Sequence, residues 1–129
     1  MILDASAVVA IVLREPGWEV LVDAVANEPP CGIGAPTVVE SGIVLTAKLG
    51  PSADGMLAHL LQLAGATIIP FTDDHWRVAV EAYTRFGKGR HAAGLNFGDC
   101  LSYAVARLAE QPLLFVGDDF RKTDLVAAR

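Results

Sequence analysis

Short apolar segments alternate along the chain with helical patterns of apolar residues. Four segments have the length and composition of buried strands: 1–3, 31–35, 67–69 and 112–116. Between them, the spacing of apolar residues predicts helices at 7–13, 18–26, 36–48, 53–63, 73–86 and 97–109. Residues that favour the N-cap position precede four of these helices: Ser6, Ser52, Thr72 and Asn96. The last residues of the chain, from about 118 onward, have no clear pattern.

Strands separated by helices indicate parallel pairing with right-handed crossovers. We therefore expect an α/β fold, a three-layer α/β/α sandwich with a mainly parallel central sheet. A chain of 129 residues fits one such domain, and we assign residues 1–129 to it. Ligands of open parallel sheets bind beyond the carboxyl ends of the strands, so this edge is where functional residues are expected.

Composition adds three expectations. An apolar share of 53% exceeds the usual content of soluble domains and indicates a buried subunit interface. The longest apolar run, Ala7 to Leu13, is much shorter than the roughly 18 residues of a membrane span, and no basic residue precedes it as in a secretory signal. We therefore expect a cytoplasmic protein without a membrane partner. The two cysteines, Cys31 and Cys100, are expected to be reduced and to have no functional role.

Four acidic residues interrupt segments that otherwise have the composition of a core. Asp4 and Asp118 follow strand segments, whereas Glu40 and Asp99 lie early in predicted helices. A buried carboxylate needs a partner, hydrogen bonds or a metal, and one shared metal site would satisfy all four. Carboxylates without a His or Cys cluster favour Mg²⁺, with Mn²⁺ as the other option. The net charge of −5 gives no broad footprint for nucleic acid, but bound cations reverse the field locally.

Each acid taken alone also has a purely structural explanation. Asp4 is able to cap the helix that follows it, and Asp118 suits a turn. Glu40 and Asp99 would be stabilised near the positive ends of their helices. Spacing alone does not decide between these explanations and a shared metal site.

The segments around these acids resemble the PIN-domain ribonucleases, and specifically the VapC toxins of type II toxin–antitoxin modules. The resemblance spans essentially the whole chain and rests on four motifs in family order: MILDASAVVAIVLREPGWE, APTVVES, GLNFGDCLSYAVA and LLFVGDDFRKTDL. It implies that Asp4, Glu40 and Asp99 are the core catalytic and metal-binding acids, and that Ser6 supports the first of them. For the fourth acid we expect Asp118 over its neighbour Asp119, although the spacing departs by one residue from many relatives.

The resemblance also implies an activity and partners. We expect Mg²⁺-dependent cleavage of RNA phosphodiester bonds by a metal-activated water, a homodimer and a cognate VapB-type antitoxin. An Arg from such an antitoxin would pair with the acids. The apolar helix around Val39 to Leu49 is a candidate for dimer or antitoxin contacts, and ordinary coverage of the sheet is the alternative. Asp124 is expected to lie in a turn or cap.

A short basic loop precedes the predicted helix that carries Asp99. We expect its residues Lys88, Arg90 and His91, together with Ser6, to contact the RNA substrate, since phosphate contacts position nucleic acids. A solvated surface loop is an equally good interpretation.

Three other functions are less compatible with the motifs. A phosphatase of the haloacid dehalogenase type requires a second Asp where this chain has Ser6. A response-regulator receiver requires paired acids and a late Lys that are missing here. A catalytically degenerate PIN-like module that only binds RNA or protein remains the alternative to an enzyme.

Overall fold

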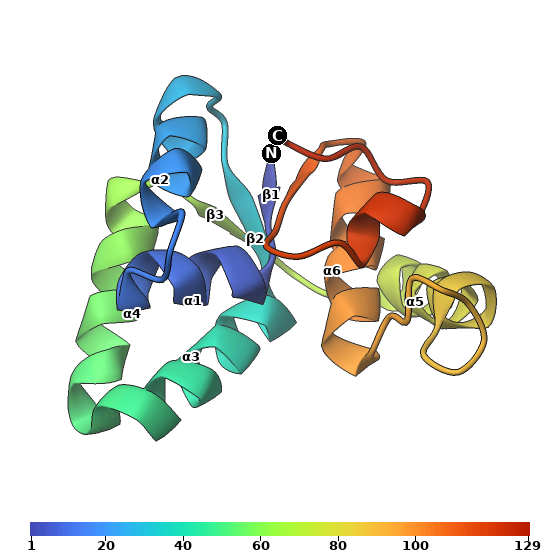
Figure 1. The fold of residues 1–129 in the computed structure, drawn as a ribbon, viewed down its shortest axis with the longest axis horizontal. Coiled ribbons are helices and arrows are strands. Elements are labelled where there is room, and N and C mark those ends of the chain that lie inside the picture. Colours follow the sequence, from blue (N-terminus) through green and yellow to red (C-terminus); the bar gives the residue numbers. More distant parts are fainter.

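The computed structural model describes residues 1–129 and consists of six α-helices around a four-stranded sheet (Figure 1). The strands are β1 (Ile2–Leu3), β2 (Gly32–Gly34), β3 (Thr67–Ile69) and β4 (Leu113–Leu114). The helices are α1 (Ala5–Leu13), α2 (Trp18–Asn27), α3 (Ala35–Leu49), α4 (Ala53–Leu63), α5 (Asp73–Phe86) and α6 (Phe97–Ala109). Two short 3₁₀ helices, η1 (Gly50–Ser52) and η2 (Phe120–Lys122), complete the chain.

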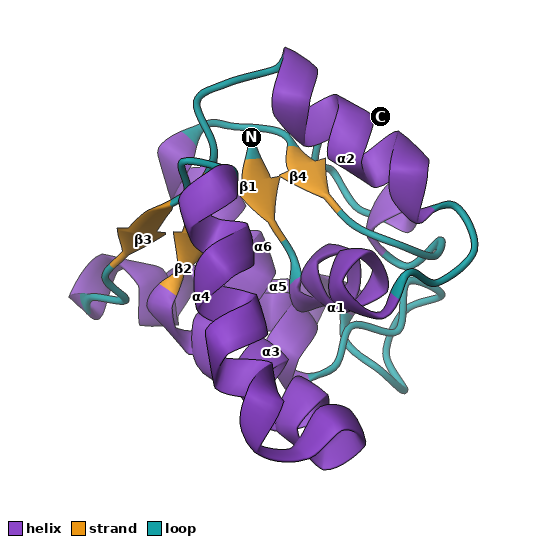
Figure 2. Cartoon of the chain, turned by 90° about the vertical axis from the view of Figure 1, so that its left-hand side faces the viewer, coloured by secondary structure: helices purple, strands orange, loops and turns teal.

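The sheet is parallel throughout, with the strand order β3-β2-β1-β4 (Figure 2). Ile2 of β1 pairs with Gly32 on one side and with Leu113 on the other. The chain thus runs outward from β1 to β3 and returns to place β4 on the opposite side of β1. This change of direction beside β1 is a topological switch point, where α/β folds bind ligands. The predicted parallel α/β architecture is confirmed.

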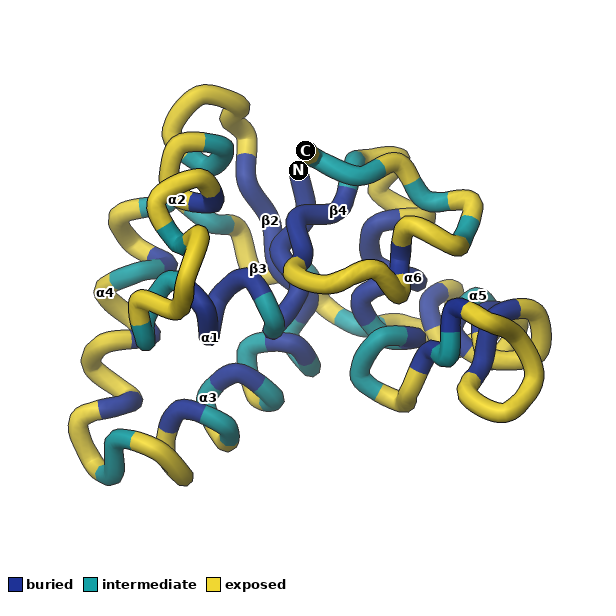
Figure 3. Tube along the Cα trace, in the orientation of Figure 1, coloured by how far each residue is buried: buried dark blue, intermediate teal, exposed yellow.

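Helices cover both faces of the sheet, and the strands divide the core into two parts. Leu3 and Leu114 belong to the apolar cluster under α1 to α4, whereas Ile2 and Leu113 belong to the cluster under α5 and α6. Adjacent residues of a strand point to opposite faces, which explains the division. The strands β1, β2 and β4 are dark blue at the centre of Figure 3, with helices on either side, whereas β3 at the edge of the sheet is largely exposed. None of the helices combines the length and the apolar character needed to cross a membrane.

A close contact between β2 and α6 brings the start of α3 beside α6. A Cβ atom added to Gly34 would lie 2.8 Å from Val105 Cγ2 of α6, so only glycine permits this approach. Because α3 starts at the next residue, Ala35, its first turns lie beside α6. This arrangement places the early residues of α3 and α6, which include two of the predicted acids, at the same edge of the sheet.

The side chains predicted to cap α1 and α4 do not cap these helices. Asp4, and not Ser6, is the N-cap of α1, with φ −87° and ψ 157°, and its carboxylate accepts a hydrogen bond from the Ser6 backbone N–H. Ser52 precedes α4 as predicted, but its hydroxyl donates to the Leu49 carbonyl oxygen at 3.1 Å because η1 lies before the helix. Asn96 caps α6 as predicted.

The C-terminal residues, which had no predicted structure, cover the exposed edge of β4. The Leu113 N–H donates to the Val126 carbonyl at 2.9 Å, and the Ala128 N–H donates to the Leu113 carbonyl at 2.8 Å. This pairing satisfies backbone groups that an edge strand would otherwise expose. It also holds the loop between β4 and the C-terminus, residues 115–125, against the domain.

Candidate functional site

Asp4 lies at the carboxyl end of β1 and is 4% exposed. Three donors hold its carboxylate. Oδ2 accepts from the Ser6 backbone N–H at 3.0 Å and from the Ser6 hydroxyl at 2.6 Å, and Oδ1 accepts from the Ser102 hydroxyl at 2.6 Å. These hydrogen bonds give both carboxylate oxygens a partner in a buried position.

Ser6 connects Asp4 to the end of β4. Its hydroxyl donates to Asp4 and accepts a hydrogen bond from the Val116 backbone N–H at 3.0 Å. The hydroxyl hydrogen is therefore committed to Asp4. This arrangement is that of a residue supporting Asp4, and it leaves Ser6 no free donor for a substrate.

Asp99 lies in the first turn of α6 and shares a reciprocal cap with Asn96. The Asn96 Oδ1 accepts from the Asp99 N–H at 2.9 Å, and the Asp99 Oδ2 accepts from the Asn96 N–H at 3.0 Å. Burial raises the pKa of Asp99 to about 6; the hydrogen bond from Asn96 acts against this rise, and the charges of Asp4 and Asp119 add to it. The cap and the acidic site thus use the same carboxylate.

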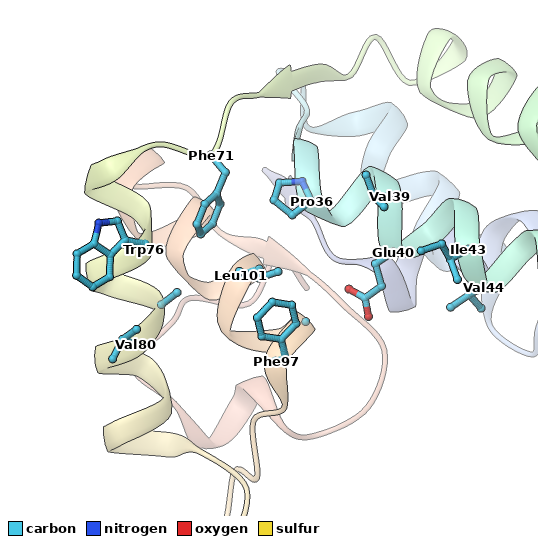
Figure 4. Close-up of a pocket in the computed structure, with 12 residues that line it drawn as sticks. Pro36, Val39, Glu40, Ile43, Val44, Phe71, Trp76, Val80, Phe97 and Leu101 are labelled. Carbon is cyan, nitrogen blue, oxygen red and sulfur yellow. The ribbon is translucent and has the colours of Figure 1, made fainter.

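Glu40 projects from α3 toward the start of α6 (Figure 4). A Cβ atom added to Gly98 would lie 2.5 Å from Glu40 Oε1 and 2.6 Å from Oε2, so the carboxylate lies directly against the α6 backbone. Burial raises the pKa of Glu40, and the charges of Asp4 and Asp99 raise it further. Three of the four predicted acids therefore converge where the first turns of α3 and α6 meet the end of β1.

Asp118 and Asp119 follow β4 and are both exposed. Of this pair, Asp119 is the residue whose charge raises the pKa of Asp99. The backbone carbonyl of Asp118 accepts from the Arg121 N–H at 3.1 Å in a turn. The charge of Asp119 thus acts on the acidic site, whereas the sequence favoured Asp118 as the fourth acid.

Asp124 belongs to a different cluster. Its carboxylate accepts a hydrogen bond from the Tyr103 hydroxyl at 2.7 Å and forms ion pairs with Arg85 at 3.2 Å and Arg107 at 3.8 Å. Burial acts to raise the pKa of Asp124, but the Tyr103 hydrogen bond and the two guanidinium charges lower it. The role of this residue is to tie the C-terminal segment to α5 and α6.

The donor set of the acidic site fits a hard divalent cation. Asp4, Glu40 and Asp99 offer only carboxylate oxygens, and their mutual repulsion is relieved by a bound cation. No three His, Cys, Asp or Glu side chains are arranged so that they would hold one ion. Both oxygens of Asp4 accept hydroxyl hydrogen bonds, and one oxygen of Asp99 is engaged in the helix cap.

The basic loop before α6 offers one unrestrained cation. The Arg90 Nε donates to the Thr84 carbonyl at 3.3 Å, and the guanidinium lies 6.0 Å from the Tyr83 ring centre. The His91 Nδ1 accepts from the Ala93 N–H at 3.0 Å. Lys88 is exposed and has no side-chain hydrogen bond or ion pair. The loop thus contacts α5 through Arg90 and leaves Lys88 free for a ligand.

An apolar groove of about 750 Å³ adjoins the acidic site between α3, α5 and α6 (Figure 4). Glu40 and Gly98 line the groove together with apolar side chains. Among these, Phe97 is 80% exposed, Ile43 65% and Val39 60%. Large apolar side chains exposed side by side mark a surface for a partner. The apolar surplus of the composition thus lies partly on the outside of the domain, next to the acids.

The chain is similar to known proteins over nearly its whole length. The PIN domain family matches residues 1–126. The chain is 48% identical to ribonuclease VapC36 of Mycobacterium tuberculosis over 126 residues, which cover 97% of this chain and 91% of the relative. It is 42% identical to ribonuclease VapC of Mycolicibacterium smegmatis, with 98% of each chain covered. The chain belongs to the PIN-domain family of VapC ribonucleases.

Solved structures of PIN-domain toxins share the fold. The crystal structure of Mycobacterium tuberculosis VapC20, a toxin that cleaves the sarcin-ricin loop, matches with a TM-score of 0.78 at 20% identity, over 97% of this chain and 95% of that one. The structure of VapBC2 from Rickettsia felis bound to a promoter DNA fragment matches with a TM-score of 0.77 at 16% identity, over 98% and 95%. These likenesses confirm the three-layer α/β/α fold.

Two residues of this PIN-domain site were missed by the sequence prediction. Ser102 and Thr37 are each 1% exposed, and their hydroxyl oxygens lie 3.3 Å apart. A hydroxyl inside a helix has many ordinary explanations, so neither residue was conspicuous. The available signal was position: Ser102 lies one turn after Asp99, and Thr37 lies one turn before Glu40.

Proposed function

We propose that this PIN-domain chain is a Mg²⁺-dependent endoribonuclease, the toxin of a VapBC toxin–antitoxin system. The observation that carries the proposal is the convergence of Asp4, Glu40 and Asp99 at the carboxyl edge of the parallel sheet. A side-chain nucleophile is not required, because metal-dependent phosphodiester hydrolysis uses a water. The carboxylate-only donor set favours Mg²⁺, and Mn²⁺ has the same ligand preference.

The three acids have distinct tasks in this proposal. Asp4 and Asp99 are the direct ligands of Mg²⁺, and Glu40 either binds it through a water or orients the attacking water. The metal, when bound, supplies activation of that water and neutralisation of charge at the scissile phosphate. Ser6 and Ser102 hold Asp4 in one rotamer by short hydrogen bonds. Gly98 keeps the space into which the Glu40 carboxylate fits.

The fourth acid of the site is Asp119 in this proposal. Its charge acts on Asp99, and the buried side chain of Phe120, which packs 5.2 Å from Phe115 between ring centres, anchors the adjacent residue. Asp118, the sequence-based choice, lies one residue further from this anchor.

Substrate contacts are assigned to the loop before α6. Lys88 is the principal phosphate contact because its ammonium group is exposed and unpaired, while Arg90 and His91 contribute from positions held by α5 and the loop itself. Such contacts position the RNA backbone without reading its sequence.

The partners are a second copy of the chain and a cognate VapB-type antitoxin. Solved relatives of the same fold include VapBC2 of Rickettsia felis and a toxin–antitoxin complex from Klebsiella pneumoniae, which matches with a TM-score of 0.72. The apolar groove supports the assignment, because its exposed side chains need a partner. Since Glu40 lines the groove, a protein seated there borders the acids, and an Arg of the antitoxin would pair with them.

The proposed activity is tested by RNA cleavage under metal control. The purified chain, freed of antitoxin, is incubated with total RNA and with a phosphomonoester, in Mg²⁺ and in chelator, beside the Asp99→Asn variant. We expect cleavage of RNA only, only with metal, and only by the wild type. A folded wild type that binds RNA without cutting it would instead identify a degenerate binding module.

A further inference from the structure

We propose that Ser102 is a positioning residue for the acidic site, acting through Asp4, and that this inference rests on the proposed metal-dependent function. Ser102 is 1% exposed and donates its hydroxyl hydrogen to the Asp4 Oδ1 at 2.6 Å. This carboxylate oxygen has no other hydrogen-bond donor in the protein, because Ser6 donates to Oδ2. Ser102 therefore determines the orientation of the Asp4 oxygen that Ser6 does not hold.

This hydrogen bond is part of a continuous network of hydrogen bonds that joins all four acid-bearing segments. The Thr37 Oγ1 lies 3.3 Å from the Ser102 Oγ, which donates to Asp4. Asp4 accepts from Ser6, and the Ser6 Oγ accepts from the Val116 N–H at 3.0 Å. The network runs from α3 through α6 and the end of β1 to the residue after β4.

Each residue of the network is close in sequence to one of the acids. Thr37 precedes Glu40 by one helical turn, Ser102 follows Asp99 by one turn, and Val116 precedes Asp119 by three residues. A shift of any segment would therefore change the position of Asp4 relative to the acid on that segment. Ser102 lies on α6 and contacts both Thr37 of α3 and Asp4. Loss of its hydroxyl would therefore remove the hydrogen bonds that connect α3 and α6 to Asp4.

Burial of Thr37, Ser102 and Asp4 makes this part of the network costly to break. Thr37 and Ser102 are excluded from water, and no buried side-chain polar atom of the protein lacks a hydrogen-bond partner. Loss of the Ser102 hydroxyl would leave an Asp4 oxygen without its donor in a dry environment. Residues that hold metal ligands in this way typically change metal affinity or activity by about 10- to 100-fold when they are removed.

The test compares Ser102→Ala with Ser41→Ala. Ser41 is a matched control, because it is fully buried on α3 and its hydroxyl donates only to the Thr37 carbonyl at 2.7 Å. Both variants lose one buried hydroxyl, but only Ser102 touches an acid. Mn²⁺ binding without RNA is measured by electron paramagnetic resonance of the free ion, together with kcat and KM for an RNA oligonucleotide and the melting temperature.

We expect Ser102→Ala to raise the Mn²⁺ dissociation constant about 10-fold and to lower kcat similarly, with KM for RNA changed less than about two-fold. Ser41→Ala should match the wild type in Mn²⁺ affinity at whatever melting temperature it shows. Ser102→Thr, which keeps the hydroxyl, should recover most of the Mn²⁺ affinity. Equal Mn²⁺ affinity in the two alanine variants would overturn the role of Ser102 and leave the proposed function standing. Absence of Mn²⁺ binding by the wild type would overturn the proposed function as well.

Discussion

The Glu40 carboxylate lies against Gly98, so that a Cβ atom on Gly98 would stand 2.5 Å from Glu40 Oε1. A Gly98→Ala variant must therefore displace the carboxylate, and we expect RNA cleavage to fall about ten-fold as misplaced catalytic groups typically cause. Alanine should not destabilise α6, since it favours a helix over glycine by roughly 0.5–1 kcal/mol. Cleavage rate and melting temperature are the measurements.

Gly55→Ala is the control for that variant. Gly55 lies in α4, and an added Cβ atom would meet no atom within 4 Å. It should show the helix stabilisation without any loss of cleavage. Equal activity of the two alanine variants would contradict a role for the Glu40–Gly98 contact.

The raised pKa of Asp99 predicts a pH-dependent stability of the metal-free protein. Its pKa is about 6 in the folded chain against an ordinary value of 3.8, so the folded state binds the extra proton between these values. The free energy of unfolding therefore falls as pH rises from about 4 to about 6, and ionised Asp99 costs on the order of 1–2 kcal/mol above this window after allowance for solvent screening.

Asp99→Asn removes that charge and keeps the cap, because a carboxamide oxygen also accepts from the Asn96 N–H. We expect a higher melting temperature than the wild type at about pH 7.5 in chelator, no difference at about pH 3.5, and no RNA cleavage. Scanning calorimetry at the two pH values provides the measurement. A melting-temperature difference that is equal at both pH values would show that ionised Asp99 does not destabilise the fold.

The two adjacent acids after β4 should differ in function. We expect Asp119→Asn to reduce RNA cleavage by at least about ten-fold, because Asp119 acts on Asp99, and Asp118→Asn to reduce it by less than about two-fold. Both residues are exposed, so neither change should alter the melting temperature measurably. The reverse order of effects would assign the fourth position to Asp118.

The apolar groove predicts a specific change in assembly. Ile43 lines the groove and is 65% exposed, whereas Leu63 is 73% exposed on α4 outside it. With the groove as the interface of the proposed dimer, we expect Ile43→Asp to yield a monomer, since a buried unpaired charge is costly at an interface. Leu63→Asp should leave the proposed dimer intact. Light scattering after size-exclusion chromatography measures the mass. A dimer that survives Ile43→Asp would place the subunit interface elsewhere.

The sequence predicted the parallel fold and three of the site residues for a physical reason. Asp4, Glu40 and Asp99 interrupt apolar segments, and acids in such places need an explanation that local structure alone does not supply. The structure shows that two of the local explanations also hold, because Asp4 caps α1 and Asp99 lies in the first turn of α6, where it completes the cap with Asn96. Capping and membership of the acidic site are therefore not alternatives here.

Other features were beyond the reach of the sequence. Ser102 contacts Asp4 across 98 positions of chain, and no local pattern encodes such a contact. Helical spacing identified the apolar face of α3, but spacing does not reveal whether a second layer covers Ile43. The choice between Asp118 and Asp119 depends on how the loop turns after β4, where Phe120 is buried.

The shared cap of Asn96 and Asp99 has an evolutionary consequence. One nucleotide change converts an Asp codon to an Asn codon, and the carboxamide satisfies the same helix start while relieving the charge repulsion. A gene copy silenced by this change is therefore expected to encode a protein that still folds. Such silenced copies would persist in genomes as intact domains and would not decay through misfolding.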